Sequence, residues 1–143
     1  MSERECHISA MHGVTMPQRL RSLTLDLPFP PTVNGYWRNI GDNRTIISKQ
    51  GRIFRQEVAE IVMANRAAWK IAKPVCVFVT YSPPDRRVRD LDNYAKALFD
   101  SLTHAGVWAD DSQIREMHIA WGKTGKPGST RITITEMAAM RKE

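Results

Sequence analysis

Hydrophobic and polar residues alternate along several short stretches of this 143-residue chain and follow helical spacing along two others. Strict alternation over residues 22–27 predicts a half-buried strand, which the following prolines end. Runs rich in β-branched and aromatic residues predict further strands over residues 75–81, 114–121 and 130–136, and a short one over 45–47. The chain is therefore expected to contain five strands.

Two stretches carry apolar residues on one helical face. Over residues 50–70, Phe54 and Val58 begin such a face, so we expect a helix there. A second helix is expected to begin near Asp92 and to end before Gly106, because glycine suits the position after a helix end. The resulting order, β-β-α-β-α-β-β, predicts one α+β domain in which a mixed sheet is covered by two helices.

The two ends of the chain differ in pattern. Residues 1–21 are polar and basic without a sustained period, so we interpret them as a flexible N-terminal extension. Residues 22–143 then form the folded domain, a size that one core accommodates. The segment 122–128 is glycine-rich and basic and too long for a tight hairpin turn, which predicts a flexible loop.

The net charge of the chain indicates which class of binding partner to expect. Lysine and arginine outnumber aspartate and glutamate by 21 to 15, for a net charge of +6. Such an excess favours a polyanion such as nucleic acid. No apolar run approaches the roughly 20 residues of a membrane span, and no secretory signal is present, so no membrane partner is expected. Two cysteines indicate neither a disulfide framework nor a zinc cluster, which fits a cytoplasmic protein.

Asp90 and Asp92 flank a leucine just before the second predicted helix. In an extended segment their side chains point the same way, so two hard oxygen ligands converge as Mg²⁺ requires. Lys96, four residues later, lies on the same helical face as Asp92. These residues also have structural interpretations: the carboxylates could cap the helix, and Lys96 could form ion pairs with Asp92 and Asp100.

A second acidic pair, Asp110 and Asp111, follows the predicted helix. A helix of this length places its end some 20 Å from its start, which separates this pair from Asp92. One site forms only if the chain after Gly106 returns along the helix, or if the site lies beside the helix middle. The second pair could also be only a polar turn.

At these residues the sequence resembles the RusA family of crossover junction endodeoxyribonucleases. The likeness covers about 110 residues after the extension. It is carried by Leu27-Pro-Phe-Pro-Pro31 with Asn34 and Tyr36, Pro84-Asp-Arg-Arg-x-Arg-Asp-Leu-Asp-Asn93, Lys96, Phe99-Asp-x-Leu102, Ala105-Gly-Val-Trp-x-Asp-Asp111 with Gln113, and Ile132-Thr-Ile-Thr-Glu136.

The resemblance implies a homodimer that binds four-way Holliday junctions and makes paired symmetrical nicks in DNA recombination and repair, using Mg²⁺ or Mn²⁺. The essential carboxylates of the family fall on Asp90, Asp92 and Asp111, and its essential lysine falls on Lys96. Asp110 lies beside them as a further candidate metal ligand.

Basic and aromatic residues supply the expected DNA surface. Phosphate contact is assigned to the cationic side chains and base stacking to the aromatic ones, although the arginines could be a solvated loop and the aromatic residues half-buried core. The candidate DNA-binding residues are Asn34, Tyr36, Trp37, Arg38, Arg86, Arg87, Arg89, Lys123 and Lys126.

Two other functions fit the same residues. A nuclease selective for flaps or other branched DNA would use the same metal chemistry on another substrate. A basic DNA-binding module without catalysis would use its acidic residues only as helix caps, and it would show no metal-dependent nicking.

Overall fold

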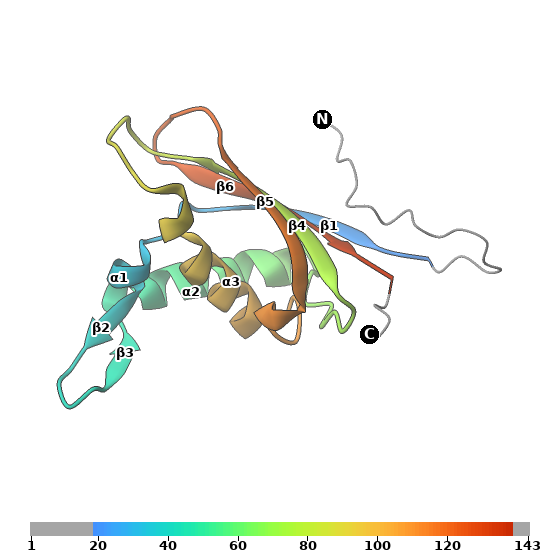
Figure 1. Cartoon of the computed structure of the whole chain (residues 1–143), viewed down its shortest axis with the longest axis horizontal. Coiled ribbons are helices and arrows are strands. Elements are labelled where there is room, and N and C mark those ends of the chain that lie inside the picture. The colour runs from blue at the N-terminus through green and yellow to red at the C-terminus, as the bar shows by residue number, and fades with distance from the viewer. Residues whose placement is uncertain (1–18, 139–143) are drawn as a thin grey trace.

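The computed structural model describes residues 19–138, whose main element is a four-stranded sheet (Figure 1). Its strands are β1 (Ser22–Leu27), β4 (Val75–Ser82), β5 (Ile114–Trp121) and β6 (Ser129–Glu136). The order across the sheet is β1-β6-β4-β5. Only β4 and β5 are parallel; the other two pairs are antiparallel. The predicted α+β class with a mixed sheet is therefore confirmed.

Two long helices, α2 (Lys49–Ala64) and α3 (Ala95–Ala105), cover one face of this sheet (Figure 1). Between them and the sheet lies a core of fully buried apolar side chains. It includes Leu25, Val58, Val77, Leu98 and Ile132. The alternation that predicted the strands thus separates a buried face from an open one.

The first long helix is shorter than its apolar spacing predicts. It ends at Ala64, not at residue 70, because Arg66 takes a left-handed backbone conformation with φ of 53°. The amide of Ala67 then donates to the carbonyl of Val62, which closes the helix end. Trp69 continues the helical spacing in sequence only, so the predicted end was wrong by six residues.

The second long helix has the predicted C-terminus. Gly106 adopts φ of 87° directly after Ala105. This left-handed conformation is strained for a residue with a side chain but not for glycine. Its start is less regular than predicted, because a short 3₁₀ turn, η1 (Leu91–Asn93), precedes α3. A second such turn, η2 (Asp111–Gln113), precedes β5.

A small hairpin projects from one end of the molecule (Figure 1). Its strands are β2 (Trp37–Asn39) and β3 (Thr45–Ile47), and the one-turn helix α1 (Val33–Tyr36) leads into it. The predicted strand over 45–47 therefore exists, but it belongs to this separate two-stranded sheet.

Two loops meet beyond the C-terminal end of β4. The amide of Gly125, in the predicted loop 122–128, donates to the carbonyl of Pro83 at 2.9 Å. Gly128 has φ of 88°, and a side chain there would lie 3.0 Å from the Pro84 ring. The β5–β6 loop is thus packed on the loop that leads to the candidate site.

The ends of the described chain lie at the sheet. Residues 1–18 of the expected extension lie outside the described residues. Arg21, the last residue of that expected extension, is bound to Glu136: its amide donates to Oε1 at 2.9 Å and its guanidinium to Oε2 at 2.8 Å. Within residues 19–138, no helix has the length and apolar character needed to cross a membrane.

Candidate active site

Asp90 and Asp92 lie where the loop after β4 enters η1. Asp90 is extended, with φ of −87° and ψ of 126°, and both side chains are exposed. Neither carboxylate caps a helix: η1 has no side-chain capping bond, and the residue before α3 is Tyr94, which also makes none. Among residues 19–138, neither carboxylate has a hydrogen-bond or ion-pair partner. The helix-cap interpretation therefore does not describe them.

Asp110 and Asp111 are neighbours with different surroundings. The Asp110 carboxylate accepts a bond from the Ser112 amide at 3.0 Å, and its own amide donates to the Gln113 side chain at 2.8 Å. Hydrogen bonds from Ser112, with a smaller effect of the Lys96 charge, lower the pKa of Asp110. Asp111 is partly exposed, and its carboxylate has no partner in the described part of the chain. Asp110 thus caps η2, whereas Asp111 is available as a ligand.

Gln113 holds this turn against the rest of the fold. Its side-chain amide donates to the carbonyls of Ile71 and Lys73, at 2.8 and 2.9 Å. In the sequence, Gln113 stood out only as part of the family motif. The structure gives it a positioning role for Asp111, two residues before it.

The chain after α3 turns back along the helix, as a single site requires. The amide of Val107 donates to the carbonyl of Leu102, and the Trp108 indole donates to the Thr103 hydroxyl at 2.6 Å. The Trp108 ring lies 5.9 Å from the Phe99 ring. The turn η2 consequently packs against α3. The chain after Gly106 thus returns along the last turns of α3, but within residues 19–138 the carboxylates of Asp90, Asp92 and Asp111 do not gather within 4.8 Å of one another.

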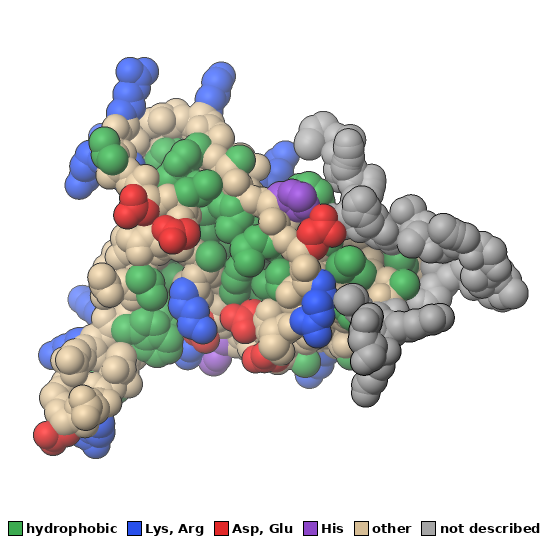
Figure 2. Space-filling view, viewed as in Figure 1, with side chains coloured by type: hydrophobic (Ala, Val, Ile, Leu, Met, Phe, Trp, Pro, Cys, Tyr) green, Lys and Arg blue, Asp and Glu red, His purple; other side chains and the backbone are tan. Residues whose placement is uncertain are grey.

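Lys96 is an exposed side chain in the first turn of α3. Its charge lowers the pKa of Asp110 and contributes to lowering that of Asp100. No carboxylate of residues 19–138 lies within 4.0 Å of its ammonium group, so the alternative interpretation, ion pairs with Asp92 and Asp100, does not describe Lys96. Figure 2 shows acidic side chains on the face over the start of α3, with a basic side chain among them. Within the described chain, Lys96 is thus an unpaired cation in an acidic neighbourhood.

Asp100, by contrast, is part of a closed network. It accepts a short hydrogen bond from the Tyr36 hydroxyl and an ion pair from Arg55 at 2.8 Å. Burial alone would raise the pKa of Asp100, but these bonds outweigh burial and lower it. The network fastens α1 and α2 to α3.

This network corrects one predicted DNA contact. Tyr36 is fully buried, and its ring packs edge-on against Trp37 at 5.1 Å. It cannot stack on a base, because its ring faces the core and its hydroxyl is bound to Asp100. Trp37 is half-buried, and Asn34 and Arg38 are exposed at the base of the hairpin.

The arginines before Asp90 have unequal roles. Arg89 is mostly buried, with its side chain 13% exposed; it pairs with Asp85 at 2.8 Å and lies 5.6 Å from the Phe29 ring. Arg87 pairs with the same carboxylate at 3.2 Å but is 79% exposed. Arg86 is exposed. Arg89 therefore shapes the loop, while its two neighbours face solvent.

The remaining basic candidates lie on the adjoining loop. Lys123 and Lys126 are exposed, and their loop is bonded to the arginine loop through Gly125 and Pro83. Figure 2 shows Lys and Arg side chains clustered at this end of the molecule. Two loops that are far apart in sequence thus present one basic rim.

Four aromatic rings form a cluster around Tyr94, the residue that precedes α3. Tyr94 lies 4.9 Å from Phe29, 5.7 Å from Tyr81 and 6.1 Å from Trp121, between ring centroids. Tyr81 is fully buried, and burial raises the pKa of its hydroxyl. Rigid packing of this kind holds a neighbouring functional residue in place.

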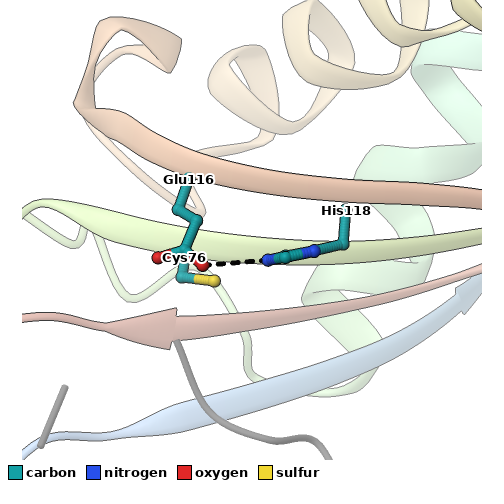
Figure 3. Close-up of side chains that lie close together, drawn as sticks. All are labelled: Cys76, Glu116 and His118. Carbon is teal, nitrogen blue, oxygen red and sulfur yellow. Dashed lines mark hydrogen bonds and ion pairs between the residues drawn. The ribbon is translucent and has the colours of Figure 1, made fainter. Parts of the chain in front are cut away.

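One other group of candidate ligands lies on the open face of the sheet (Figure 3). Glu116 and His118 pair at 2.9 Å beside Cys76, and His118 stacks on Phe78 at 4.5 Å. Within residues 19–138 this is the only trio of such side chains whose ligand atoms lie within 4.8 Å of one another. Cys76 is not a free thiol, so we assign no metal to this trio.

Asp90, Asp92 and Asp111 are more widely spaced than that trio. Their chemistry nevertheless fits a hard divalent cation, since they offer carboxylate oxygens that no arginine, lysine or amide of the described chain occupies. A divalent cation held by such carboxylates would activate a water and neutralise charge on a phosphate.

Comparison with known proteins agrees with this class. A family model described as Endodeoxyribonuclease RusA matches residues 28–135. The crossover junction endodeoxyribonuclease RusA of Enterobacteria phage 82 is 42% identical over 113 residues, which cover 79% of this chain and 93% of the relative. That of Escherichia coli strain K12 is 39% identical over 118 residues, or 82% and 98% of the two chains. The chain belongs to the RusA family, and the predicted class of enzyme, an endodeoxyribonuclease, is confirmed.

Proposed function

We propose that this protein is a Mg²⁺-dependent endonuclease that resolves four-way DNA junctions by paired symmetrical nicks. One observation carries the proposal: within residues 19–138 Asp90, Asp92 and Asp111 lack partners, although the carboxylates of Asp26, Asp85, Asp100 and Glu136 are each paired with an arginine. The names of the relatives, which describe crossover junction endodeoxyribonucleases, support the choice of substrate.

Each candidate site residue has a separate task in this proposal. Asp90, Asp92 and Asp111 would hold the metal, Mg²⁺ or Mn²⁺, which supplies a nucleophilic water and neutralises charge on the phosphate. Asp110 would be at most a weaker ligand, because its carboxylate already accepts the Ser112 amide. Lys96 is free to place its charge against the phosphate, where charge builds up in the transition state.

The exposed cations would bind the junction arms. Arg86 and Arg87, with Lys123 and Lys126 on the adjoining loop, form a basic rim beside Asp90. Phosphate contacts of this kind set affinity and register without reading sequence. Asn34, Trp37 and Arg38, in α1 and β2 at the base of the hairpin, would contact a second part of the DNA.

We further propose a homodimer that acts in the cytoplasm in DNA recombination and repair. A four-way junction has two-fold symmetry, so two matching cuts call for two matching sites. Light scattering tests this part: a strictly monomeric protein that makes coordinated paired nicks would contradict it.

The substrate assay separates the proposal from the two alternatives. Purified protein is incubated with labelled four-way, flap and linear duplex DNA, with and without Mg²⁺. We expect paired nicks in the four-way junction only, and only with the metal. Preferential cutting of flaps would favour the branched-DNA nuclease, and binding without any nicking would favour the non-catalytic module.

A further inference from the structure

A cleft of about 610 Å³ is lined in part by Arg87, Val88 and Arg89, the residues that precede Asp90 in the chain. Its walls come from the segment around Phe29, from the first three turns of α2 and from the loop before Asp90. Val88 and Ile53 line it with apolar side chains that are 98% and 52% exposed. Phe29, which is half-buried and packs on the buried ring of Tyr94 at 4.9 Å, gives the lining its aromatic surface. The cleft thus combines aromatic and apolar surface with a place next to the candidate site.

Charged groups in the cleft have both signs. Arg87 and Arg89 lie on the side of the loop, and Glu57 on the side of α2. Glu57 is exposed, and in residues 19–138 its carboxylate has no hydrogen-bond or ion-pair partner. A site built for phosphate alone would be weakened by a carboxylate and would gain nothing from the apolar wall that Val88 provides.

A nucleotide base matches this surface better than a phosphate does. Bases stack on aromatic and apolar side chains and against arginine planes. A carboxylate accepts hydrogen bonds from the exocyclic amino group of a base, which adenine, cytosine and guanine have on their pairing edges and thymine lacks. A hollow of this volume has room for one nucleotide, and a base enters it only when it is unstacked from its neighbours.

We propose that this cleft binds one unstacked base next to the phosphate to be cut, and that Glu57 favours a base with an exocyclic amino group over thymine. The inference rests on the proposed function, which places the cut phosphate at Asp90. Val88 and Arg89 directly precede Asp90 in the chain. A base in the cleft would then belong to a nucleotide adjacent to the one at the carboxylates. Unstacking costs least near a branch point, where pairing is already interrupted.

The first experiment measures base preference at the cut. Four junctions that differ only in the base beside the expected cut are cleaved in Mg²⁺ by the wild type, by Glu57→Gln and by Glu60→Gln. Glu60 is the matched control: it is exposed on the same helix, outside the cleft, and accepts a bond from Gln56. We expect the wild type to cut the thymine junction about fivefold more slowly, the factor that one hydrogen bond gives.

Glu57→Gln should abolish that discrimination, because its amide can also donate to thymine, while Glu60→Gln should retain it. Equal cutting of all four junctions by the wild type would overturn the proposal, as would a Glu57→Gln protein that discriminates like the wild type.

A second experiment reports on the cleft without cleavage. The fluorescent base 2-aminopurine replaces the base beside the cut, and its emission is followed as protein is added in the absence of metal. We expect the emission to change on binding, and we expect Val88→Ser to reduce that change at least twofold. Met63→Ser is the control: its side chain is 76% exposed and lies outside the cleft, so the change in emission should be the same as for the wild type.

The two readouts distinguish the two proposals. A fluorescence response that depends on Val88, in a protein that never cuts in Mg²⁺, would refute the proposed nuclease function and keep the base-binding cleft. Normal junction cleavage with no response, or with the same response in Val88→Ser, would refute the cleft and keep the nuclease.

Discussion

Asp92 and Asp100 are two helical turns apart on the same stretch of chain, yet their carboxylates have opposite surroundings. Asp100 accepts bonds from Tyr36 and Arg55 and is about three-quarters shielded from solvent, with its side chain 27% exposed. Asp92 is exposed and unpaired among the described residues. The first carboxylate is committed to the fold, whereas the second remains available to a ligand.

The same division runs through the other acidic residues. Asp26, Asp85 and Glu136 each have an arginine within 3.2 Å, and they lie on strands or in a loop. Asp90 and Asp111 have none in the part of the chain that the structure describes. A basic protein with arginines to spare could pair these carboxylates too. Leaving them unpaired is consistent with a function that needs their charge.

The largest effect is expected from removing an available carboxylate. Asp92→Asn should lower Mg²⁺-dependent junction cleavage by orders of magnitude, because a neutral amide is a poor ligand for a hard cation. The midpoint of urea unfolding should stay within error, since the Asp92 carboxylate bonds to nothing in residues 19–138. Junction affinity without metal should hold or rise, because one negative charge leaves a surface that faces DNA. Near wild-type cleavage by Asp92→Asn would remove Asp92 from the site.

A committed carboxylate should give the opposite result. Asp100→Asn should lower the free energy of unfolding by about 1–2 kcal/mol, because two donors lose a charged acceptor in a partly buried setting. Cleavage per folded molecule should remain measurable. Asp26→Asn is the matched control: its pair with Arg131 is 66% exposed on both sides, so the expected loss is below about 0.5 kcal/mol. Urea titrations of the three proteins check this order.

A smaller effect is expected from the basic rim. Replacing both Arg86 and Arg87 with alanine should reduce the dependence of log K on log salt by about two units at most, one for each phosphate that is no longer neutralised. Cleavage should persist at saturating protein, because neither residue is a metal ligand. A single Arg131→Ala change, on the open face of the sheet, should leave the slope nearly unchanged. Equal slopes for all three proteins would place the DNA elsewhere.

The smallest effect concerns acid stability at the C-terminal end of β6. Burial would raise the pKa of Glu136, but its bonds from Arg21 outweigh burial and lower it below the usual value. A lowered carboxyl pKa contributes stability that is fully present above the unfolded pKa, about 4.3, and is lost as the pH falls through the folded pKa. Glu136→Gln should therefore unfold with a flatter pH dependence below about pH 4, as followed by circular dichroism. An unchanged profile would show that Arg21 contributes little.

Local patterns in the sequence predicted most of the fold. The alternation around Leu25 and Ile132 and the helical spacing around Val58 and Leu98 each depend on which side of an element is buried, which is a local property. Strand partners are not local. Periodicity indicates that the strand containing Ile132 has a buried face but not that it lies between β1 and β4.

The candidate site shows the same limit. The carboxylates and Lys96 could be named from spacing and family resemblance, but their freedom from partners among the described residues could not. Tyr36 was assigned to DNA because it lies in a polar loop; its actual partner, Asp100, is 64 residues away. The end of α2 was predicted wrongly because Arg66 adopts a left-handed conformation, which an arginine side chain gives no reason to expect.

The position of β6 determines when the protein can fold as it leaves the ribosome. Its residues pair with β1 on one side, from Ser22 opposite Thr135 to Leu27 opposite Thr130, and with β4 on the other. Until residues 129–136 have been made, β1 has no strand beside it and β4 has one open edge. Both helices can form earlier, but they have only an incomplete sheet to cover, and open strand edges invite pairing with other chains. A pause in translation before residue 129 would therefore leave these strand edges of the nascent chain open to pairing with other chains.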